Sequence, residues 1–267
     1  MGDLMSIAAR CARIGGQVIA GRFSAARALS WKVQDGVASI VTDADLAAEA
    51  AIREFLASVC PDDLVLAEEG ASVDARAPRL WVVDPLDGST NYARGNPVCC
   101  VSVAYAEAGE VLAAAVYDPF RRELFTARRG KGARRNGRPV TVTTSADLRE
   151  AVIACGAPSP RRPDAAAARR LLHLATEQVY RVRVYGSTAL ELCWVAAGRL
   201  EGAVNWNSHW WDVAAAALIL TEAGGAFSPA AQDWGANPTC TTSIGSNGPL
   251  QAALEGLARR SVADLRE

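Results

Sequence analysis

The order of apolar and polar residues along the chain predicts a mixed α/β protein. Leu4 to about Leu29 carries apolar residues at helical spacing, and a second helical pattern follows Thr42, whereas 31–36 has the composition of a connection. Strands are expected in short apolar runs, at 37–41, 64–66, 80–83, 98–106, 111–117 and 123–127.

The character of the sequence changes near residues 143–149, and we place a boundary there between subdomains 1–145 and 146–267. Beyond it, helical and strand patterns alternate, as in an α/β unit. Strands are expected at 152–154, 182–184, 200–204 and 243–246, and helices at 165–178, 189–197, 213–223 and 249–259.

The stretch with the most distinctive chemistry follows the apolar run that ends at Val83. This run predicts a buried strand that delivers Asp84 at its carboxyl end, and we expect Pro85 to end the strand because it has no N–H. A turn would then let Asp84 and Asp87 converge. The next residues, Gly88-Ser89-Thr90, read as a helix entry whose free N–H groups face the same space.

Two carboxylates beside a row of backbone donors indicate a particular kind of site. Carboxylates bind hard cations through oxygen, and the N–H groups at a helix start bind anions such as phosphate. Phosphate and carboxylates repel each other unless metal ions lie between them, so the combination favours a metal-assisted phosphoester hydrolase. The plainer alternative is a surface turn in which Asp87 caps a helix.

Three other acids are candidates for the same site. Asp45 follows Thr42 in a capping-box pattern, and capping alone would explain it. Glu68 follows a predicted strand, and the alternation of a strand lets only Glu68 or Glu69 point the same way as the other acids; we choose Glu68. Asp212 lies at a predicted helix start, where N-capping is the alternative.

Composition narrows the class of protein. The chain has 267 residues, 50% of them hydrophobic and 21% charged, with a formal net charge of −1, so nothing favours a nucleic acid or a membrane as partner. The seven cysteines are scattered without a Cys-x-x-Cys pair, which predicts reduced thiols in a cytoplasmic protein. The N-terminus is a poor signal peptide, and no apolar run approaches membrane-spanning length.

The basic stretch 128–138 is either a phosphate-binding patch or, as we favour, a solvated loop.

With these motifs in order, the chain resembles the inositol monophosphatase family of magnesium-dependent, lithium-sensitive phosphatases. The string Asp84–Asn91 (DPLDGSTN) is similar to the first family signature. Trp211–Ala215 (WDVAA) with Glu222–Gly225 (EAGG) is similar to the second. The resemblance covers nearly the whole chain, since similar segments also fall at 41–45, 68–69, 128–137 and 186–198.

The resemblance implies a layered αβαβα fold with the site between the subdomains, and two or three Mg²⁺ ions per site. The implied metal ligands are Glu68, Asp84, the Leu86 carbonyl, Asp87 and Asp212. Several carboxylates in one cleft cannot all stay ionised without cations, so elementary electrostatics agrees with this.

The resemblance also assigns catalytic and phosphate-binding roles. Asp45 would orient the Ser89 hydroxyl, and the metal-activated water that attacks phosphorus would lie near Glu68 and this pair. The phosphate donors would be the N–H groups of Gly88 and Ser89, with Thr90 beside them. The predicted substrate contacts are Asp87, Gly186, Ser187, Thr188, Asn205, Trp206 and Asp212. A homodimer acting on a small phosphorylated metabolite is expected.

Three positions depart from the family pattern. Members often have Lys in the loop before Val-Thr, whereas here Lys32 is displaced from it. Ser89 replaces the usual Thr and keeps the hydroxyl. Asn205 stands where inositol-hydrolysing members carry a Glu that contacts substrate hydroxyls, so a substrate other than plain inositol phosphate is expected.

The leaving group and the function class are left open at this point. A small phosphorylated polyol, sugar, cyclitol or amino alcohol is favoured, with histidinol phosphate or a nucleotide-type ester as alternatives. An aspartyl-nucleophile phosphatase using Asp43 would want Thr or Val where Ala47 stands. A regulatory binding role is the other alternative, because some bacterial relatives are thought to act with the transcription machinery through their surface.

Overall fold

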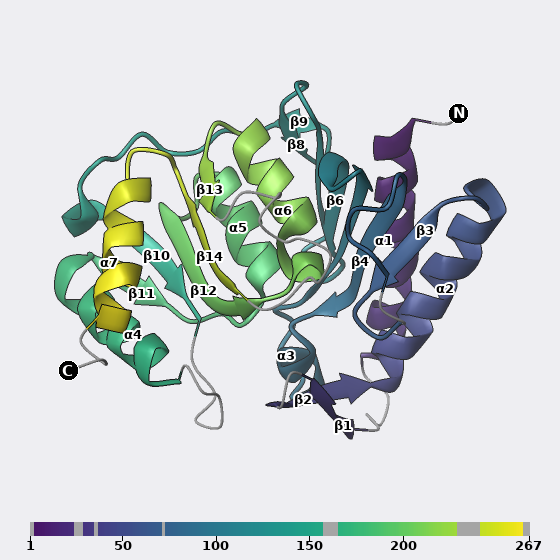
Figure 1. Ribbon diagram of the computed structural model, residues 1–267, viewed down its shortest axis with the longest axis horizontal. Helices are drawn as coiled ribbons and strands as arrows, with labels where there is room; N and C mark the ends of the chain where they lie inside the picture. The colour runs from purple at the N-terminus through teal and green to yellow at the C-terminus, as the bar shows by residue number, and fades with distance from the viewer. Residues whose placement is uncertain are drawn as a thin grey trace.

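The computed structural model describes residues 3–23, 29–34, 37–70, 73–156, 165–228 and 241–263. In these residues helices and sheets form alternating layers (Figure 1). Two helices cover a seven-stranded sheet, two more separate it from a five-stranded sheet, and a last pair covers the far face. The layered αβαβα fold expected from the sequence is confirmed.

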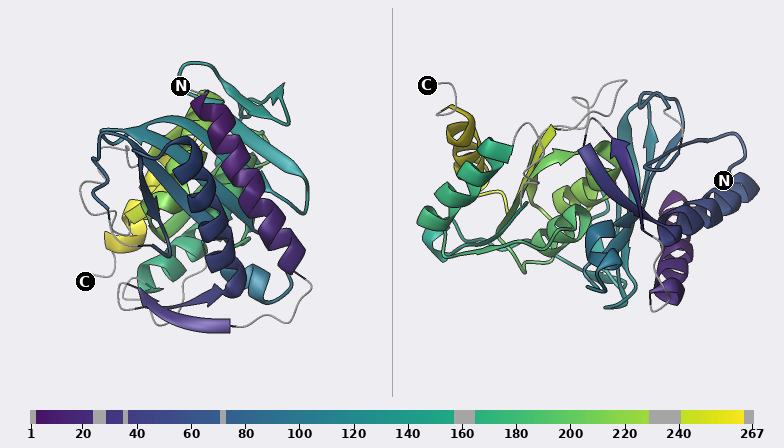
Figure 2. Two further views of the ribbon diagram at one scale, coloured as in Figure 1. Left: turned by 90° about the vertical axis from the view of Figure 1, so that its right-hand side faces the viewer. Right: turned by 90° about the horizontal axis from the view of Figure 1, so that it is seen from below.

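The outer helical layer consists of α1 (Leu4–Arg22) and α2 (Asp43–Val59). They run side by side along one face of the large sheet (Figure 2, left). The expectation that the first helix reaches Leu29 is wrong, because Leu29 opens β1 (Leu29–Gln34), which pairs antiparallel with β2 (Val37–Thr42). The expected connection at 31–36 thus contains residues of β1, in which apolar and polar types alternate from Trp31 to Gln34.

The seven-stranded sheet has the order β3-β4-β5-β6-β7-β8-β9. The basic stretch after residue 128, expected to be a loop, contains its last two strands. The short α3 (Ser89–Ala93) follows β4 directly. The strands are β3 (Leu64–Ala67), β4 (Leu80–Asp87), β5 (Cys100–Glu107), β6 (Glu110–Asp118), β7 (Glu123–Arg128), β8 (Ala133–Arg135) and β9 (Arg138–Pro139).

Strand β4 does not end at Pro85, contrary to the sequence-based expectation. Asp84 pairs with Ser102 and Asp87 pairs with Cys100, so three steps on β4 match two steps on β5. One extra residue therefore makes a β-bulge, and Pro85 falls inside it, where the strand ladder needs no N–H. This bulge, and not a turn, brings the two acids to the same end of the strand.

The five-stranded sheet has the order β11-β10-β12-β14-β13. Strands β11, β10 and β12 are parallel, whereas β14 runs antiparallel to both neighbours. Its strands are β10 (Val152–Cys155), β11 (Arg181–Arg183), β12 (Gly202–Ser208), β13 (Ala226–Ser228) and β14 (Thr241–Ser246).

Helices α5 (Thr188–Ala196) and α6 (Trp210–Glu222) lie between the two sheets, and α4 (Ala165–Gln178) and α7 (Gln251–Ala263) cover the outer face of the smaller one (Figure 1). A 3-10 turn, η1 (Leu148–Glu150), precedes β10. The inner layer is almost wholly apolar, and Leu192, Trp210 and Ile219 belong to one buried cluster shared with both sheets. This packing fixes the carboxyl end of β4 against the start of α5 and α6.

The cysteines of the described residues are free, as expected; Cys240 lies outside these residues. None of the helices in the described ranges is long and apolar enough to cross a membrane. The subdomain boundary at 145/146 stays a prediction.

Candidate active site

The bulge at the end of β4 places two acids in a nearly dry environment. Asp84 is 1% exposed and Asp87 is 8% exposed. The Leu86 N–H donates to Asp84 Oδ1 at 2.9 Å, which fixes one oxygen of that carboxylate. Two carboxylates this deeply buried are costly without a positive partner, so their position calls for an explanation beyond folding.

The electrostatics around Asp84 identify the neighbouring acids. Burial raises the pKa of Asp84 well above its ordinary range, and the negative charges of Glu68, Asp87 and Asp212 raise it further, in that order. Carboxylates from β4, the end of β3 and the start of α6 therefore act on one another. The choice of Glu68 over Glu69 agrees with this, because Glu68 is the one whose charge reaches Asp84.

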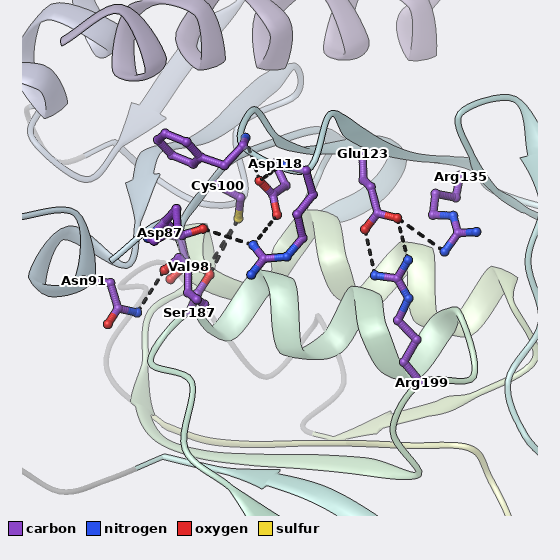
Figure 3. A network of polar contacts seen from close by, with 12 residues as sticks. Asp87, Asn91, Val98, Cys100, Asp118, Glu123, Arg135, Ser187 and Arg199 are labelled. Atoms are coloured by element: carbon purple, nitrogen blue, oxygen red, sulfur yellow. Dashed lines mark hydrogen bonds and ion pairs between the residues drawn. The ribbon is translucent and has the colours of Figure 1, made fainter. Parts of the chain in front are cut away.

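Asp87 is held by the start of α5, in the helical layer between the two sheets. Its Oδ2 accepts from Ser187 Oγ at 2.6 Å and from the Ala189 N–H at 2.8 Å, and its Oδ1 accepts from the Thr188 N–H at 3.2 Å. Figure 3 shows Asp87 facing Ser187 across this contact. Burial raises the pKa of Asp87 to about 6, while the Ser187 hydrogen bond opposes the rise.

The same network joins α5 to the large sheet at a second point. Asn91 Nδ2, on α3, donates to the Tyr185 carbonyl at 2.7 Å, just before α5. At the other end of α5, Arg199 Nη1 donates to Glu123 Oε2 at 2.7 Å (Figure 3). These contacts hold the two sheets in one orientation around the acids.

Asp45 lies beside the acids and performs two tasks. Its Oδ2 accepts from the Thr42 N–H at 2.8 Å, so the predicted capping box of α2 is confirmed. Its Oδ1 accepts from Ser89 Oγ at 2.8 Å, and the same hydroxyl lies 2.8 Å from the Leu86 carbonyl oxygen. Burial raises the pKa of Asp45, against the hydrogen bonds of Thr42 and Ser89. The expected Asp45–Ser89 pair is thus formed.

Asp212 belongs to the first turn of α6. N-capping is the alternative role that the sequence suggests for Asp212, but the cap is His209, and Asp212 accepts the His209 N–H at 2.7 Å from the third helical position. The His209 ring stacks on Trp211, with ring centroids 4.6 Å apart. This capping box uses one oxygen of Asp212 and leaves the other for the site.

The start of α3 supplies backbone donors beside Asp84 and Asp87. Gly88 has φ 94°, and a Cβ there would lie 2.7 Å from the Val98 carbonyl oxygen, so only glycine fits. The first N–H groups of a helix have no partner within the helix, and those of Ser89 and Thr90 are such groups. Their phosphate contact stays a prediction.

The oxygen donors of the site suit Mg²⁺. Within the described ranges no three His, Cys, Asp or Glu side chains stand close enough to form a ready-made metal cage. Mg²⁺ seldom uses such a cage, since it keeps waters and is held by one or two carboxylates together with a substrate phosphate. The donors here are all oxygens, and the acids around Asp84 repel one another. The residues therefore fit Mg²⁺, and the number of ions stays a prediction.

Glu191, which the sequence does not single out, lies beside the predicted substrate contact Asn205. Asn205 is 6% exposed, and its Nδ2 donates to Glu191 Oε2 at 2.8 Å. Glu191 is fully buried on α5, and burial raises its pKa to about 7. The signal for it was a single acid within the apolar run of the helix predicted at 189–197.

Trp206 lies on the other face of β12 from Asn205, as strand alternation requires. It packs against the apolar cluster under α4 and α7, and it lines a cavity of about 740 Å³ between β12, β13, β14 and α7. The structure therefore does not bring Trp206 together with the acids. A contact between Trp206 and the leaving group stays a prediction that its position does not support.

The Gly-rich part of the basic stretch has a structural partner. Glu222, at the end of α6, accepts the N–H groups of Gly130 and Gly132 at 2.7 Å and that of Lys131 at 3.0 Å. Three donors that could have bound phosphate are thus occupied by a carboxylate of the chain itself. This favours the solvated-loop interpretation of these residues.

Comparison with known proteins agrees with this geometry. A model of the inositol monophosphatase family matches residues 2–264. The Nus factor SuhB of Vibrio cholerae is 36% identical over 225 residues, 84% of this chain and 84% of that protein. The Nus factor SuhB of Escherichia coli is 36% identical over 229 residues, 85% of this chain and 85% of that protein.

Solved structures show the same likeness. The extragenic suppressor protein suhB from Bartonella henselae has a TM-score of 0.87 and 30% identity, covering 97% of this chain and 99% of that one. An IMPase from Thermotoga maritima has a TM-score of 0.86 and 28% identity, covering 97% and 98%. These matches confirm the resemblance that the signature motifs indicated.

Proposed function

Because this chain belongs to the inositol monophosphatase family, we propose that it is a Mg²⁺-dependent phosphomonoesterase. The observation that supports this most strongly is the burial of Asp84 within reach of three other carboxylate charges, beside the backbone donors that open α3. Acids that destabilise one another at neutral pH are expected where a cation and an anion are to be held together.

The cation would be held by Glu68, Asp84, Asp87, Asp212 and the Leu86 carbonyl, as two or three Mg²⁺ ions. Bound Mg²⁺ supplies positive charge that offsets these carboxylates, polarises the phosphate and makes water more acidic. The hydrogen bonds of Ser187 and the start of α5 keep Asp87 in the orientation that cation binding requires.

Ser89 and Asp45 would receive the proton of the attacking water. The Ser89 hydroxyl has a single proton, which it donates in a hydrogen bond to Asp45 or to the Leu86 carbonyl, so its lone pairs can accept a hydrogen bond from the water. As the proton of the water passes to the Ser89 oxygen, the Ser89 proton would pass to the Asp45 carboxylate. The raised pKa of buried Asp45 makes this carboxylate a better proton acceptor than an exposed one. Glu68, whose charge acts on Asp84, would orient the water.

The phosphate would be bound by the N–H groups of Gly88, Ser89 and Thr90 at the start of α3. The leaving alcohol would lie toward Asn205 and the α5 start, with Gly186, Ser187 and Thr188 lining that side. We propose a small phosphorylated polyol, sugar, cyclitol or amino alcohol as substrate. Histidinol phosphate and nucleotide-type esters are the alternatives.

Phosphate release from a panel of monoesters, with and without Mg²⁺, tests the proposal. The panel comprises inositol 1-phosphate, histidinol phosphate, hexose and aminocyclitol phosphates, and nucleoside monophosphates. One preferred ester that requires Mg²⁺ is the expected result and identifies the leaving group. If inositol 1-phosphate were turned over fastest, the expectation based on Asn205 would be wrong. Release from none of the esters would contradict the catalytic proposal.

A second candidate function rests on the names of the relatives. Proteins 36% identical to this chain are called Nus factors, so a regulatory binding role is proposed as an addition to catalysis. An Asp87→Asn variant separates the two: loss of phosphatase activity with an unchanged cellular phenotype favours the regulatory role. The absence of a nucleic-acid or membrane partner stays a prediction.

The predicted assembly and location are also proposals. A cytoplasmic homodimer agrees with the family resemblance and with free cysteines in the described ranges. Light scattering of the purified protein tests the assembly, and a mass of one chain would contradict it.

A further inference from the structure

The buried pair of Glu191 and Asn205 has a defined polarity. Asn205 Nδ2 donates to Glu191 Oε2 at 2.8 Å, and the other carboxylate oxygen of Glu191 accepts the Gly186 N–H at 3.1 Å. Both oxygens of Glu191 thus act as acceptors. A carboxylate that only accepts compels the facing amide to turn its NH₂ group inward.

The other end of the Asn205 amide faces away from Glu191. Its Oδ1 lies next to Gly156, where a Cβ atom would come within 2.7 Å of it. In the part of the chain that the structure describes, no donor reaches this oxygen. Gly156 is itself fixed, because its N–H donates to the Val204 carbonyl at 2.9 Å. Because glycine has no Cβ, the space beside Asn205 Oδ1 stays open, and this oxygen can accept a hydrogen bond there.

The pair lies at the edge of the small sheet where ligands are expected. Strands β10, β11 and β12 are parallel, and Gly156 and Gly186 lie just beyond the carboxyl ends of β10 and β11. Asn205 follows the last residue of β12 that pairs with β10. Ligands of open α/β sheets bind at this edge. The charge of Asp87 also acts on Glu191, so the pair is next to the acids of the proposed site.

We infer that Glu191 is a positioning residue that holds the Asn205 amide with Oδ1 toward the leaving group, so that the site favours an alcohol that donates a hydroxyl hydrogen bond there. This inference rests on the proposed phosphatase function. The neutral Asn205 would provide the acceptor, and the buried Glu191 would determine its direction without touching the substrate. A site built to accept from a hydroxyl discriminates strongly against a leaving group without one.

The test compares two esters at pH 8 and saturating Mg²⁺. Glycerol 2-phosphate has free hydroxyl donors, and phenyl phosphate has none. In Glu191→Gln the amide of residue 205 can turn either way, so the ratio of the KM for glycerol 2-phosphate to that for phenyl phosphate is expected to rise about tenfold. The matched control is Glu177→Gln, an exposed acid on α4, which should leave the ratio at its wild-type value.

Two further variants make the result independent of folding. Asn205→Ala should raise the KM ratio to a similar extent, and the double variant with E191Q should raise it no further, because both changes remove one interaction. Gly156→Ala, which crowds Oδ1 without altering Glu191, should act in the same direction. If E191Q does not fold, G156A decides the inference.

Different results would contradict the proposed phosphatase function and the positioning role of Glu191. Wild-type protein that releases phosphate from neither of these two esters, nor from any ester of the monoester panel, contradicts the proposed function. Wild-type protein that hydrolyses both, with E191Q and G156A at the wild-type KM ratio, overturns this inference alone. A tenfold rise in the ratio in N205A but not in E191Q would likewise show that Glu191 does not position Asn205.

Discussion

The hydroxyl of Ser187 donates to Asp87 at 2.6 Å and joins residues 100 positions apart in the sequence. Asp87 ends β4 of the large sheet, and Ser187 precedes α5 of the central layer. The contact makes the orientation of the Asp87 carboxylate depend on how the two sheets pack, so we expect cation binding and packing to be coupled.

Removing that hydroxyl should weaken Mg²⁺ binding. In Ser187→Ala the pKa of Asp87 rises further, because the Ser187 hydrogen bond lowers it in the wild type. We expect the Mg²⁺ concentration for half-maximal phosphate release to rise about tenfold. Ser58→Ala, an exposed serine on α2, is the control. An S187A protein with the wild-type Mg²⁺ requirement would contradict the role given to this contact.

The Ser89 hydroxyl should matter for turnover and not for folding. Ser89→Ala removes the group between Asp45 and the Leu86 carbonyl, and kcat is expected to fall by roughly 10²-fold or more. Ser89→Thr keeps the hydroxyl and should retain most of the activity. Single-turnover phosphate release measures both, and equal rates in S89A and S89T would show that no proton passes through this hydroxyl.

Acid pH should stabilise the metal-free protein over a defined window. The pKa of Asp87 is raised from 3.8 to about 6 in the folded state, so the folded protein binds more protons than the unfolded chain between these values. Stability from this group is present below pH 3.8 and is lost as the pH rises through about 6.

The melting temperature with a chelator present measures this effect. Between pH 7 and pH 5 we expect the wild type to gain roughly 3 °C relative to Asp87→Asn, which cannot titrate there. Saturating Mg²⁺ should remove most of the difference, because the cation then offsets the charge. Parallel pH profiles for the two proteins without metal would count against the raised pKa.

Glu222 should contribute to stability and not to catalysis. Glu222→Ala leaves three N–H groups of the 130–132 loop without their acceptor, at a cost of about 2 kcal/mol in the free energy of unfolding. Urea unfolding measures the cost, with the exposed Glu177→Ala as control. If Glu222→Ala changed the KM for the phosphate ester and left the free energy of unfolding unchanged, a phosphate-binding role for this loop would be favoured instead.

Local sequence signals were sufficient for several parts of the site. The capping-box spacing placed Asp45 at the start of α2, and the apolar run before Asp84 predicted a buried strand. Both depend on neighbours only a few residues away. Strand alternation and turn chemistry also singled out Glu68 and Asp87, whereas the assignment of these acids as ligands of two or three ions came from the family resemblance.

What the sequence did not reveal depends on distant partners. Pro85 was expected to end β4, but the pairing with β5 turns the surplus residue into a bulge. Glu191 is a single acid in an apolar helix, and the sequence does not show that the Asn205 amide donates to it. For the Gly-rich loop at 130–132 the sequence left phosphate binding as an alternative to a solvated loop, and it gave no sign that Glu222 accepts the N–H groups of that loop. Each of these needed a contact between elements that no spacing rule provides.

The account depends most directly on whether the acids around Asp84 make phosphate release dependent on Mg²⁺. The decisive measurement is the initial rate on the preferred ester across a Mg²⁺ titration, in the wild type and in Asp84→Asn, which removes one charge and keeps the shape. We expect no release without Mg²⁺, saturable activation of the wild type, and a loss of roughly 10³-fold or more in D84N. Release that is independent of Mg²⁺, or a D84N protein as active as the wild type, would contradict the account.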